Sequence, residues 1–189
     1  PVFDPVARSR AKVLTSGLPA SPGAASGQIV FFADDATRWH DDGHRVIMVR
    51  IETSPEDLAG MSAAEGILTA RGGMTSHAAV VARGMGKCCV SGAGAIMVDY
   101  KARTVEIDGT IIREGDYISL NGSTGEVYAG EVKTRPAEVT GDFAELMDLC
   151  KKYSKLVVRT NADTPHDAEV ASNFGAVLAG LCRRERLPT

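Results

Sequence analysis

The sequence predicts a turn-rich α/β protein that contains one complete domain and part of a second. The chain has 189 residues, 44% of them hydrophobic, which is enough for one ordinary domain and too little for three. Its 20 glycines and 8 prolines exceed the usual share and disfavour a helix bundle. Short apolar runs of strand length also alternate with segments of helical spacing.

Charge, hydropathy and cysteine use limit the possible function classes. With 21 basic and 24 acidic residues, the chain lacks the basic excess that favours nucleic acid or an anionic membrane. No apolar run approaches the ~20 residues of a membrane span, and no signal-peptide-like segment opens the sequence. Cys88, Cys89, Cys150 and Cys182 show no C-x-x-C spacing. We therefore expect reduced thiols in a cytoplasmic protein that binds neither nucleic acid nor membrane.

The first part of the chain predicts short strands that alternate with helices. Residues 1–17 are expected to be an N-terminal linker, and the prolines of 18–23 predict a rigid turn. A helix is expected after Asp34-Asp35, and a second begins at Ser54-Pro55 with acidic residues in its first turn. Apolar runs predict strands at 28–32, 46–49, 66–69 and 88–90.

Two hairpins and a change of composition follow. An Asp108-Gly109 turn separates two β-branched runs, and the loop 121–125 separates a second pair of strands. Residues 131–141 carry charges without apolar periodicity and are expected to be a linker. A helix is expected over 142–154, where apolar residues share one face. The last segment predicts one βαβ unit, with strands at 156–158 and 176–181 around a helix at 165–174.

The segment with the clearest chemistry is the run Gly72-Gly73-Met74-Thr75-Ser76-His77. It follows a predicted strand and opens a helix of small residues that ends near residue 85. The two glycines allow unusual backbone angles and a close approach by a ligand. Thr75 or Ser76 can cap the helix, whose free N–H groups and positive dipole end favour an anion. His77 is therefore placed to carry a phosphoryl group, whereas the competing interpretation is a structural histidine that hydrogen-bonds to backbone.

Other candidate residues carry weaker signals. His40 and His44 have a spacing that could hold a metal on a helix, but Gly43 between them favours a solvated helix end. His166 follows a proline in a first helical turn and is expected to be exposed. Arg83 could reach back toward His77, and an exposed helix end explains it equally well. A redox role for Cys88-Cys89 is disfavoured because both lie in an apolar run of strand type.

The twelve positions from Gly72 to Arg83 resemble the phosphohistidine signature of the phosphoenolpyruvate-utilising enzymes. Within this family the segments 18–25, 52–57 and 74–92 are most similar to the pyruvate phosphate dikinases. Phosphoenolpyruvate synthases and the enzymes I of the sugar phosphotransferase system usually have Arg at the position of Met74, and they lack the Cys-Cys pair. The resemblance extends over almost the whole chain.

The resemblance implies a swivelling β/β/α phosphohistidine domain over 18–130. It implies a linker and helix over 131–155, and over 156–189 the truncated start of a TIM barrel that binds phosphoenolpyruvate and pyruvate. His77 would carry the phosphoryl group, supported by the loop residues Gly72, Gly73, Thr75 and Ser76.

The implied reaction converts ATP, phosphate and pyruvate to AMP, pyrophosphate and phosphoenolpyruvate. The chain would not be active alone, because it would need an ATP-grasp domain, a complete barrel domain and Mg²⁺ bound outside this chain. The full enzyme would be a cytoplasmic homodimer. An alternative within the family is a phosphoenolpyruvate synthase-type domain. Outside it, the alternatives are a stand-alone phosphohistidine carrier and a binding module in which His77 is structural.

Three further residues acquire roles only from the resemblance. In plant members the Thr two residues before the histidine is a regulatory phosphorylation site, which corresponds to Thr75. Arg159 and Arg183 match arginines that bind substrate at the ends of the first two barrel strands. The sequence departs from the family after residue 183, where Arg184 and Arg186 replace Thr and His, so these two arginines are inherited positions rather than a working site.

Overall fold

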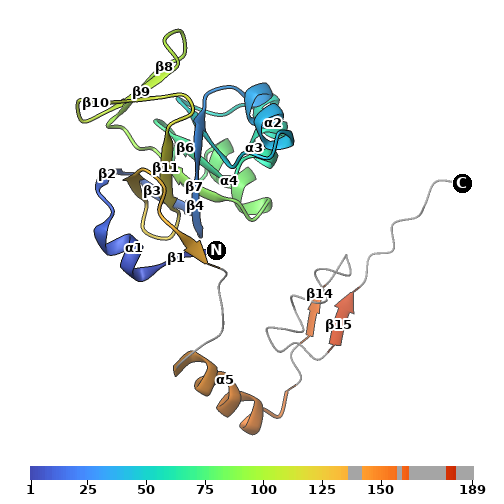
Figure 1. Cartoon of the computed structure of the whole chain (residues 1–189). Coiled ribbons are helices and arrows are strands. Elements are labelled where there is room, and N and C mark those ends of the chain that lie inside the picture. The colour runs from blue at the N-terminus through green and yellow to red at the C-terminus, as the bar shows by residue number, and fades with distance from the viewer. Residues whose placement is uncertain (136–141, 157–158, 162–177, 182–189) are drawn as a thin grey trace, which may run out of the picture. The chain divides into compact units, whose positions relative to one another are not determined.

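The computed structural model describes residues 1–135, 142–156, 159–161 and 178–181 (Figure 1). The chain divides into two compact units, Pro1–Ala137 and Glu138–Thr189. The first unit contains the diglycine run and His77, and it is a mixed α/β structure, as the sequence predicts.

The first unit contains three sheets and several short helices. Its strands are β1 (Val2–Phe3), β2 (Val13–Ser16), β3 (Leu18–Ser21), β4 (Ala24–Val30), β5 (Val46–Arg50), β6 (Gly66–Thr69), β7 (Cys88–Ser91), β8 (Ile96–Asp99), β9 (Thr104–Ile107), β10 (Thr110–Arg113), β11 (Tyr117–Asn121), β12 (Glu126–Ala129) and β13 (Thr134–Arg135). Its helices are α1 (Pro5–Arg10), α2 (Ala33–Asp41), the 3-10 turn η1 (Pro55–Asp57), α3 (Leu58–Ala63) and α4 (His77–Gly84).

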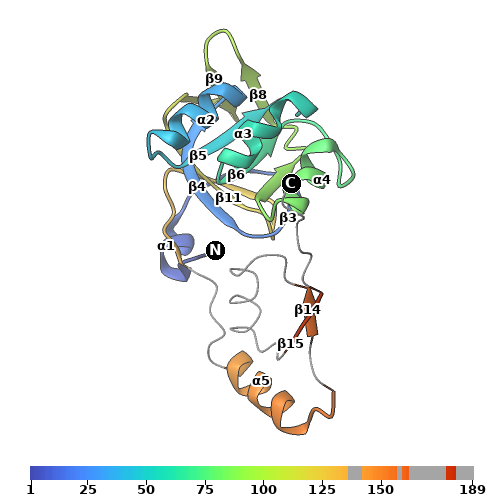
Figure 2. The same ribbon diagram turned by 90° about the vertical axis from the view of Figure 1, so that its right-hand side faces the viewer.

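An eight-stranded sheet forms the centre of this unit, in the order β2-β12-β11-β4-β5-β6-β7-β3. The four strands β4, β5, β6 and β7 run parallel, and the others pair antiparallel. Parallel neighbours need a crossover connection, and here each crossover contains a helix: α2, then η1 with α3, then α4. Figures 1 and 2 show these three helices together on one side of the sheet.

The buried strand β5 shows how the layers are held together. Ile47 and Val49 pack into one core, whereas Val46 and Met48 pack into the other, because side chains alternate between the faces of a strand. The first core also contains Ile96, Val105, Ile107 and Ile112 of the small sheet β10-β9-β8. The second contains apolar residues of α2, α3 and α4. The layers are therefore small sheet, large sheet and helices.

The two expected hairpins are confirmed. Strands β9 and β10 pair antiparallel with Ile107 opposite Thr110. Asp108 and Gly109 between them have φ values of 47° and 77°, as a type I′ turn requires. Strands β11 and β12 form the second hairpin, with Asn121 opposite Glu126.

The N-terminal residues differ from expectation. We expected a linker over residues 1–17, but this segment contains β1, α1 and β2, and it belongs to the first compact unit. Thr15 pairs with Val127 at one edge of the large sheet, and Leu14 packs into the core. The ring of Phe3 lies edge-on to Tyr128 at 5.6 Å. These elements have no recognisable apolar pattern, because β1 and β2 each bury a single apolar residue and α1 buries none.

The expected turn over 18–23 is also corrected. Leu18–Ser21 is strand β3, which pairs antiparallel with β7 and places Pro19 opposite Val90. Proline lacks an amide donor but is tolerated in an edge strand, and β3 is the edge of the large sheet. Strand β4 likewise begins earlier than its apolar run. At Gly27 an added Cβ would lie 2.8 Å from the carbonyl oxygen of Arg45, so small residues let the chain pass closely here.

The second unit contains one helix and a parallel pair of strands. Helix α5 (Asp142–Tyr153) confirms the helix expected from the apolar stripe. Strands β14 (Arg159–Asn161) and β15 (Leu178–Leu181) pair in parallel, as the ends of a βαβ unit do. Of the strand expected at 156–158, residues 157–158 lie outside the described residues, and β14 follows them in the chain. The expected helix at 165–174, including His166, lies outside the described residues.

Candidate functional site

His77 lies at the carboxyl-terminal edge of the parallel strands. Strand β6 ends at Thr69, the diglycine loop (Ala70–Ser76) follows, and His77 is the first residue of α4. The neighbouring strand β5 ends at Arg50 and continues into a second loop, Ile51–Ser54, which we call the Thr53 loop. The two loops pair through their backbones, since Ala70 N–H donates to the Arg50 carbonyl at 3.0 Å and Arg71 N–H to the Ile51 carbonyl at 2.9 Å.

Thr53 is the residue at this site that the sequence did not reveal. Its Oγ1 lies 3.1 Å from His77 Nδ1, and both side chains are half-buried. Within the described part of the chain, His77 Nε2 makes no hydrogen bond. The available signal was topological, because adjacent parallel strands β5 and β6 must release their loops at the same edge of the sheet. One nitrogen of the imidazole is therefore held and the other is left for chemistry.

The two glycines of the loop are not equivalent. Gly72 has φ of 112°, a conformation that L side chains rarely adopt. A Cβ at this position would lie 2.9 Å from Ser76 Oγ and 3.0 Å from Ser91 Oγ. A Cβ at Gly73 would meet no atom within 4 Å. Of these two positions, only position 72 requires glycine, both for its backbone conformation and for its packing.

Ser76, rather than Thr75, caps the helix of His77. Its Oγ accepts a hydrogen bond from Ala79 N–H at 3.4 Å, whereas Thr75 is exposed. Ser76 Oγ also lies 3.4 Å from the buried Ser91 Oγ, which accepts from Thr69 Oγ1 at 3.1 Å. The start of α4 is therefore tied to the ends of two central strands.

The first turn of α4 leaves two backbone donors free. The amide groups of His77 and Ala78 precede the first intrahelical hydrogen bond, and within the described residues neither has another acceptor. Both amides point along the helix axis at its positive end, which favours an anion beside the imidazole.

Arg83 does not contact His77 in this structure. Its Nε donates to the Ala79 carbonyl at 3.0 Å, and its guanidinium also donates to the Met74 carbonyl. Arg83 thus ties α4 to the diglycine loop. Arg71 forms a loose and exposed pair with Glu52, with 3.7 Å between their charged atoms.

The cysteine pair is buried in β7. Burial raises the pKa of both the Cys88 and Cys89 thiols to about 12. Cys88 Sγ donates to the Gly23 carbonyl at 3.4 Å. Since the thiolate is the reactive form, neither group is suited to nucleophilic or redox chemistry at neutral pH.

The described residues hold no arrangement suited to a metal ion. Among residues 1–135 and the described parts of the second unit, no group of three or more His, Cys, Asp or Glu side chains comes together. His40 and His44 are exposed, and the His44 ring lies 5.8 Å from the Trp39 ring at an angle of 52°. In the same part of the chain, no helix is long and apolar enough to cross a bilayer.

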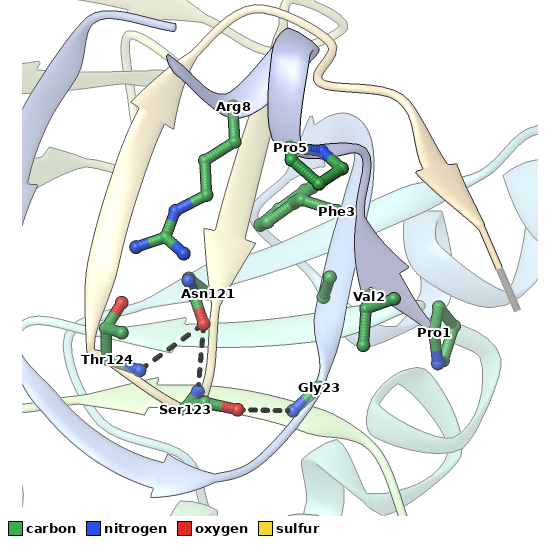
Figure 3. A pocket seen from close by; sticks show the side chains of 10 residues that line it. Pro1, Val2, Phe3, Pro5, Arg8, Gly23, Asn121, Ser123 and Thr124 are labelled. Atoms are coloured by element: carbon green, nitrogen blue, oxygen red, sulfur yellow. Dashed lines mark hydrogen bonds between the residues drawn. The ribbon is translucent and has the colours of Figure 1, made fainter. Parts of the chain in front are cut away.

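A pocket of about 250 Å³ lies away from His77, between the N-terminal segment and the β11–β12 hairpin (Figure 3). Its charged group is Arg8, whose side chain already bonds to Tyr128 and Glu126. The Asn121 Oδ1 atom in its wall accepts from the amides of Ser123 and Thr124. The two hydroxyls in its wall are likewise used within the fold, since Ser123 Oγ accepts from Gly23 N–H and Thr124 Oγ1 donates to Glu126.

The two arginines expected to bind substrate belong to the second unit. Arg159 lies in β14 and is exposed. Arg183 lies outside the described residues. Within the first unit, the structure brings together His77, Gly72, Ser76 and Thr53.

Comparisons with known proteins relate this chain to one family. Residues 43–125 match the family model of the PEP-utilising enzyme mobile domain. The chain is 57% identical to pyruvate, phosphate dikinase of Clostridium symbiosum and 54% identical to pyruvate, phosphate dikinase 2 of Zea mays, in each case over 99% of this chain and 21% of the relative. A solution structure of Enzyme I matches 57% of this chain and 38% of its own, with 24% identity and a TM-score of 0.33, which is too low to relate the folds. Residues 43–125 are therefore a mobile domain of the PEP-utilising enzyme family, in a chain that spans about a fifth of the pyruvate, phosphate dikinases it matches.

Proposed function

We propose that His77 accepts a phosphoryl group and passes it on, in the reaction that the names of the dikinase relatives describe. One observation carries the proposal: Thr53 holds Nδ1 of an imidazole whose Nε2 is free, at the N-terminus of α4. A histidine that served only to hold the helix start would use its ring nitrogens for backbone hydrogen bonds. Neither ring nitrogen of His77 does so.

The orientation of the ring selects the attacking nitrogen. When Thr53 Oγ1 accepts from Nδ1–H, the lone pair is on Nε2. Attack by Nε2 on the phosphorus of phosphoenolpyruvate forms an N–P bond and breaks the P–O bond to the enol oxygen. The enolate that leaves takes up a proton and becomes pyruvate. Reversal of these steps transfers the group to pyruvate.

The surroundings suit the phosphorylated state as well. Attack through Nε2 makes the ring a cation until Nδ1 releases its proton to solvent. A hydroxyl beside Nδ1 fits both states, because Thr53 can accept from Nδ1–H or donate to bare Nδ1. The free amides of His77 and Ala78, with the positive end of α4, would bind the phosphoryl oxygens. Gly72 and Ser76 fix the loop, and Gly73 leaves its outer side open.

The remaining parts of the proposal rest on the family. The relatives are about five times longer than this chain, which implies further domains in the full enzyme. We infer that unit 1 swivels between an ATP-grasp domain and a barrel whose start is 156–189, and that Arg159 and Arg183 contribute to its substrate site. ATP, phosphate and pyruvate would give AMP, pyrophosphate and phosphoenolpyruvate. Mg²⁺ would bind in those other domains of a cytoplasmic homodimer.

Thr75 is proposed as a regulatory phosphorylation site. It is exposed, it does not cap the helix, and it lies two residues before His77. A phosphate on its hydroxyl would place a second dianion next to the transferred group and hinder docking by bulk and like charge.

The test uses a chimera, because the chain spans only part of its relatives. Residues 1–135 replace the aligned residues of the C. symbiosum dikinase, and the protein is incubated with ³²P-phosphoenolpyruvate and Mg²⁺. We expect a base-stable, acid-labile label, located on His77 by mass spectrometry and absent from His77→Ala. No label, or an equal label in the variant, would refute the proposal.

The same chimera separates the alternatives. Formation of pyrophosphate from ATP and phosphate would identify a dikinase-type domain. If the chimera is labelled but turns over only with a synthase ATP-binding domain in place of the dikinase one, the phosphoenolpyruvate synthase alternative holds. A stand-alone carrier would accept label but support neither overall reaction.

A further inference from the structure

The Thr53 loop is fastened at both ends by side chains from outside it. At its start, Ile51 N–H donates to the Tyr100 hydroxyl at 2.8 Å. At its end, Asp57 Oδ2 accepts from Ser54 N–H at 2.9 Å and lies 3.3 Å from Ser54 Oγ. Thr53, which holds the His77 ring, thus lies between two anchored positions.

The two anchors meet at Arg50. Its guanidinium bonds to Asp57 at 3.3 Å and to the Phe31 carbonyl at 3.1 Å, and it lies 5.1 Å from the centre of the Tyr100 ring. Asp57 and Arg50 have side chains only 7% and 19% exposed. Arg50, Asp57 and Tyr100 come from the end of β5, from η1 and from the β8–β9 connection. We call these three residues the loop anchor.

A helix cap alone does not explain the loop anchor. An acidic residue at Asp57 and a serine at Ser54 complete a capping box with no help from a cation. Burying Arg50 adds a desolvation cost, and among the described residues its Nε has no hydrogen-bond partner. A cost of this kind is expected where a buried network holds a functional group in place.

The exposed ion pair of the same loop is too weak to hold Thr53 in position. The side chains of Glu52 and Arg71 are 63% and 74% exposed, and ion pairs between exposed side chains contribute little to stability. The Thr53–His77 distance of 3.1 Å leaves little margin, since a hydrogen bond is lost near 3.6 Å. The position of Thr53 therefore depends on the buried anchor.

We propose that Asp57, paired with Arg50, is a positioning residue for phosphoryl transfer. By holding the Thr53 loop it keeps Thr53 Oγ1 at His77 Nδ1, where the hydroxyl can accept from Nδ1–H and so favour the tautomer with the lone pair on Nε2. Asp57 does not touch the phosphoryl group. This inference rests on the proposed role of His77.

The first measurement needs no turnover. The complete chain is labelled with ¹⁵N-histidine, and NMR reports which nitrogen of His77 carries the proton. We expect the Nδ1–H form in the wild type and a mixture of tautomers in Asp57→Ala. Asp57→Glu should restore the Nδ1–H form, because Glu also completes a capping box. Tyr100→Phe, which removes only the acceptor for Ile51 N–H, should shift the tautomer in the same direction as Asp57→Ala.

A matched control separates positioning from stability. Ser119 is fully buried, and its hydroxyl bonds to Ser26, to the Gly130 carbonyl and to the Val132 amide on another part of the sheet. Ser119→Ala should lower the melting temperature without changing the His77 tautomer. In the chimera, Asp57→Ala and Tyr100→Phe should slow labelling about tenfold with an unchanged KM for phosphoenolpyruvate, and Ser119→Ala should not slow it.

The outcomes are distinguishable. If wild-type His77 is never labelled, the proposed function fails whatever the tautomer does. If His77 is labelled but folded Tyr100→Phe and Asp57→Ala keep both the Nδ1–H form and the wild-type rate, the positioning role is wrong. A tautomer change in Ser119→Ala as large as in Asp57→Ala would also refute it, because the effect would then follow stability alone. Should Asp57→Ala fail to fold, Tyr100→Phe decides.

Discussion

The two loops that meet at His77 are held in place by opposite means. The conformation of the diglycine loop depends on the lack of a side chain at Gly72. This residue adopts φ of 112° and lets Ser76 and Ser91 approach closely. The Thr53 loop is instead held by hydrogen bonds from its backbone amides to the hydroxyl of Tyr100 and the carboxylate of Asp57. Both loops follow neighbouring parallel strands, so the same edge of one sheet supports two kinds of positioning.

The difference matches what each loop must do at the imidazole. The diglycine loop is exposed from Arg71 to Thr75, so a bulky donor or acceptor can reach its side of the ring. The Thr53 loop is half-buried and holds Nδ1, a task that depends on direction more than on space. Changes of size should therefore damage the first loop, and loss of single hydrogen bonds should damage the second.

The largest effect is expected from Gly72→Ala. The positive φ costs a side chain about 1–3 kcal/mol, and the new Cβ must push against Ser76 Oγ, which caps α4. A displaced helix start should slow labelling of His77 in the chimera roughly 100-fold. Thermal unfolding of the chain and labelling kinetics check both parts. A stable Gly72→Ala protein with the wild-type rate would mean that the loop does not position His77.

Thr53→Val should have a smaller effect. Valine has the shape of threonine but cannot hydrogen-bond to Nδ1, so we expect about tenfold slower labelling, the equivalent of one hydrogen bond of about 1.4 kcal/mol. Thr53→Ser is the matched control and should retain most of the rate. Equal labelling rates for the valine and serine variants would show that the hydroxyl has no role. The claim that hydrogen bonds of the Thr53 loop position the imidazole would then be wrong.

A smaller effect still is expected from a charge on the exposed loop. Thr75→Glu adds one negative charge two residues before His77, and repulsion of an incoming phosphate should slow labelling about threefold in dilute buffer. In 0.5 M KCl the Debye length is only ~4 Å, so the added charge is largely screened. The loss of labelling rate should therefore be smaller at this salt concentration than in dilute buffer. Thr75→Val, which adds no charge, should label at the wild-type rate. A loss that does not respond to salt would indicate a steric cause instead.

The contrast between the loops also explains what the sequence could predict. Gly72, Ser76 and His77 lie in one continuous run, so local chemistry was enough to place a turn, a cap and a histidine at the start of a helix. Thr53 lies 24 positions before His77, and its partner becomes visible only when β5 and β6 are known to be neighbours. No local pattern reports that adjacency, because a buried apolar run does not encode which strand it pairs with.

The same reasoning covers the errors in the fold. Buried strands such as β5 and β7 were predicted because their apolar runs are continuous. The edge strands β2 and β3 were missed because an edge strand needs few apolar residues and tolerates Pro19. Sequence patterns thus identified the central strands of the sheet but not its edge strands.

The smallest effect is expected from Gly73→Ala, which isolates the role of backbone conformation. Gly73 does not have a positive φ, and its added Cβ would meet open space, so stability should change by less than about 0.5 kcal/mol. We expect labelling of His77 to stay within about twofold of wild type, because neither the cap nor the Thr53 contact moves. The adjacent Gly72→Ala is the control for the same chemical change. If Gly73→Ala kept full stability but lost labelling, a partner or phosphate would have to pass within contact distance of Gly73. The open side of the diglycine loop would then be as closely fitted to its partner as the Thr53 loop is to the imidazole.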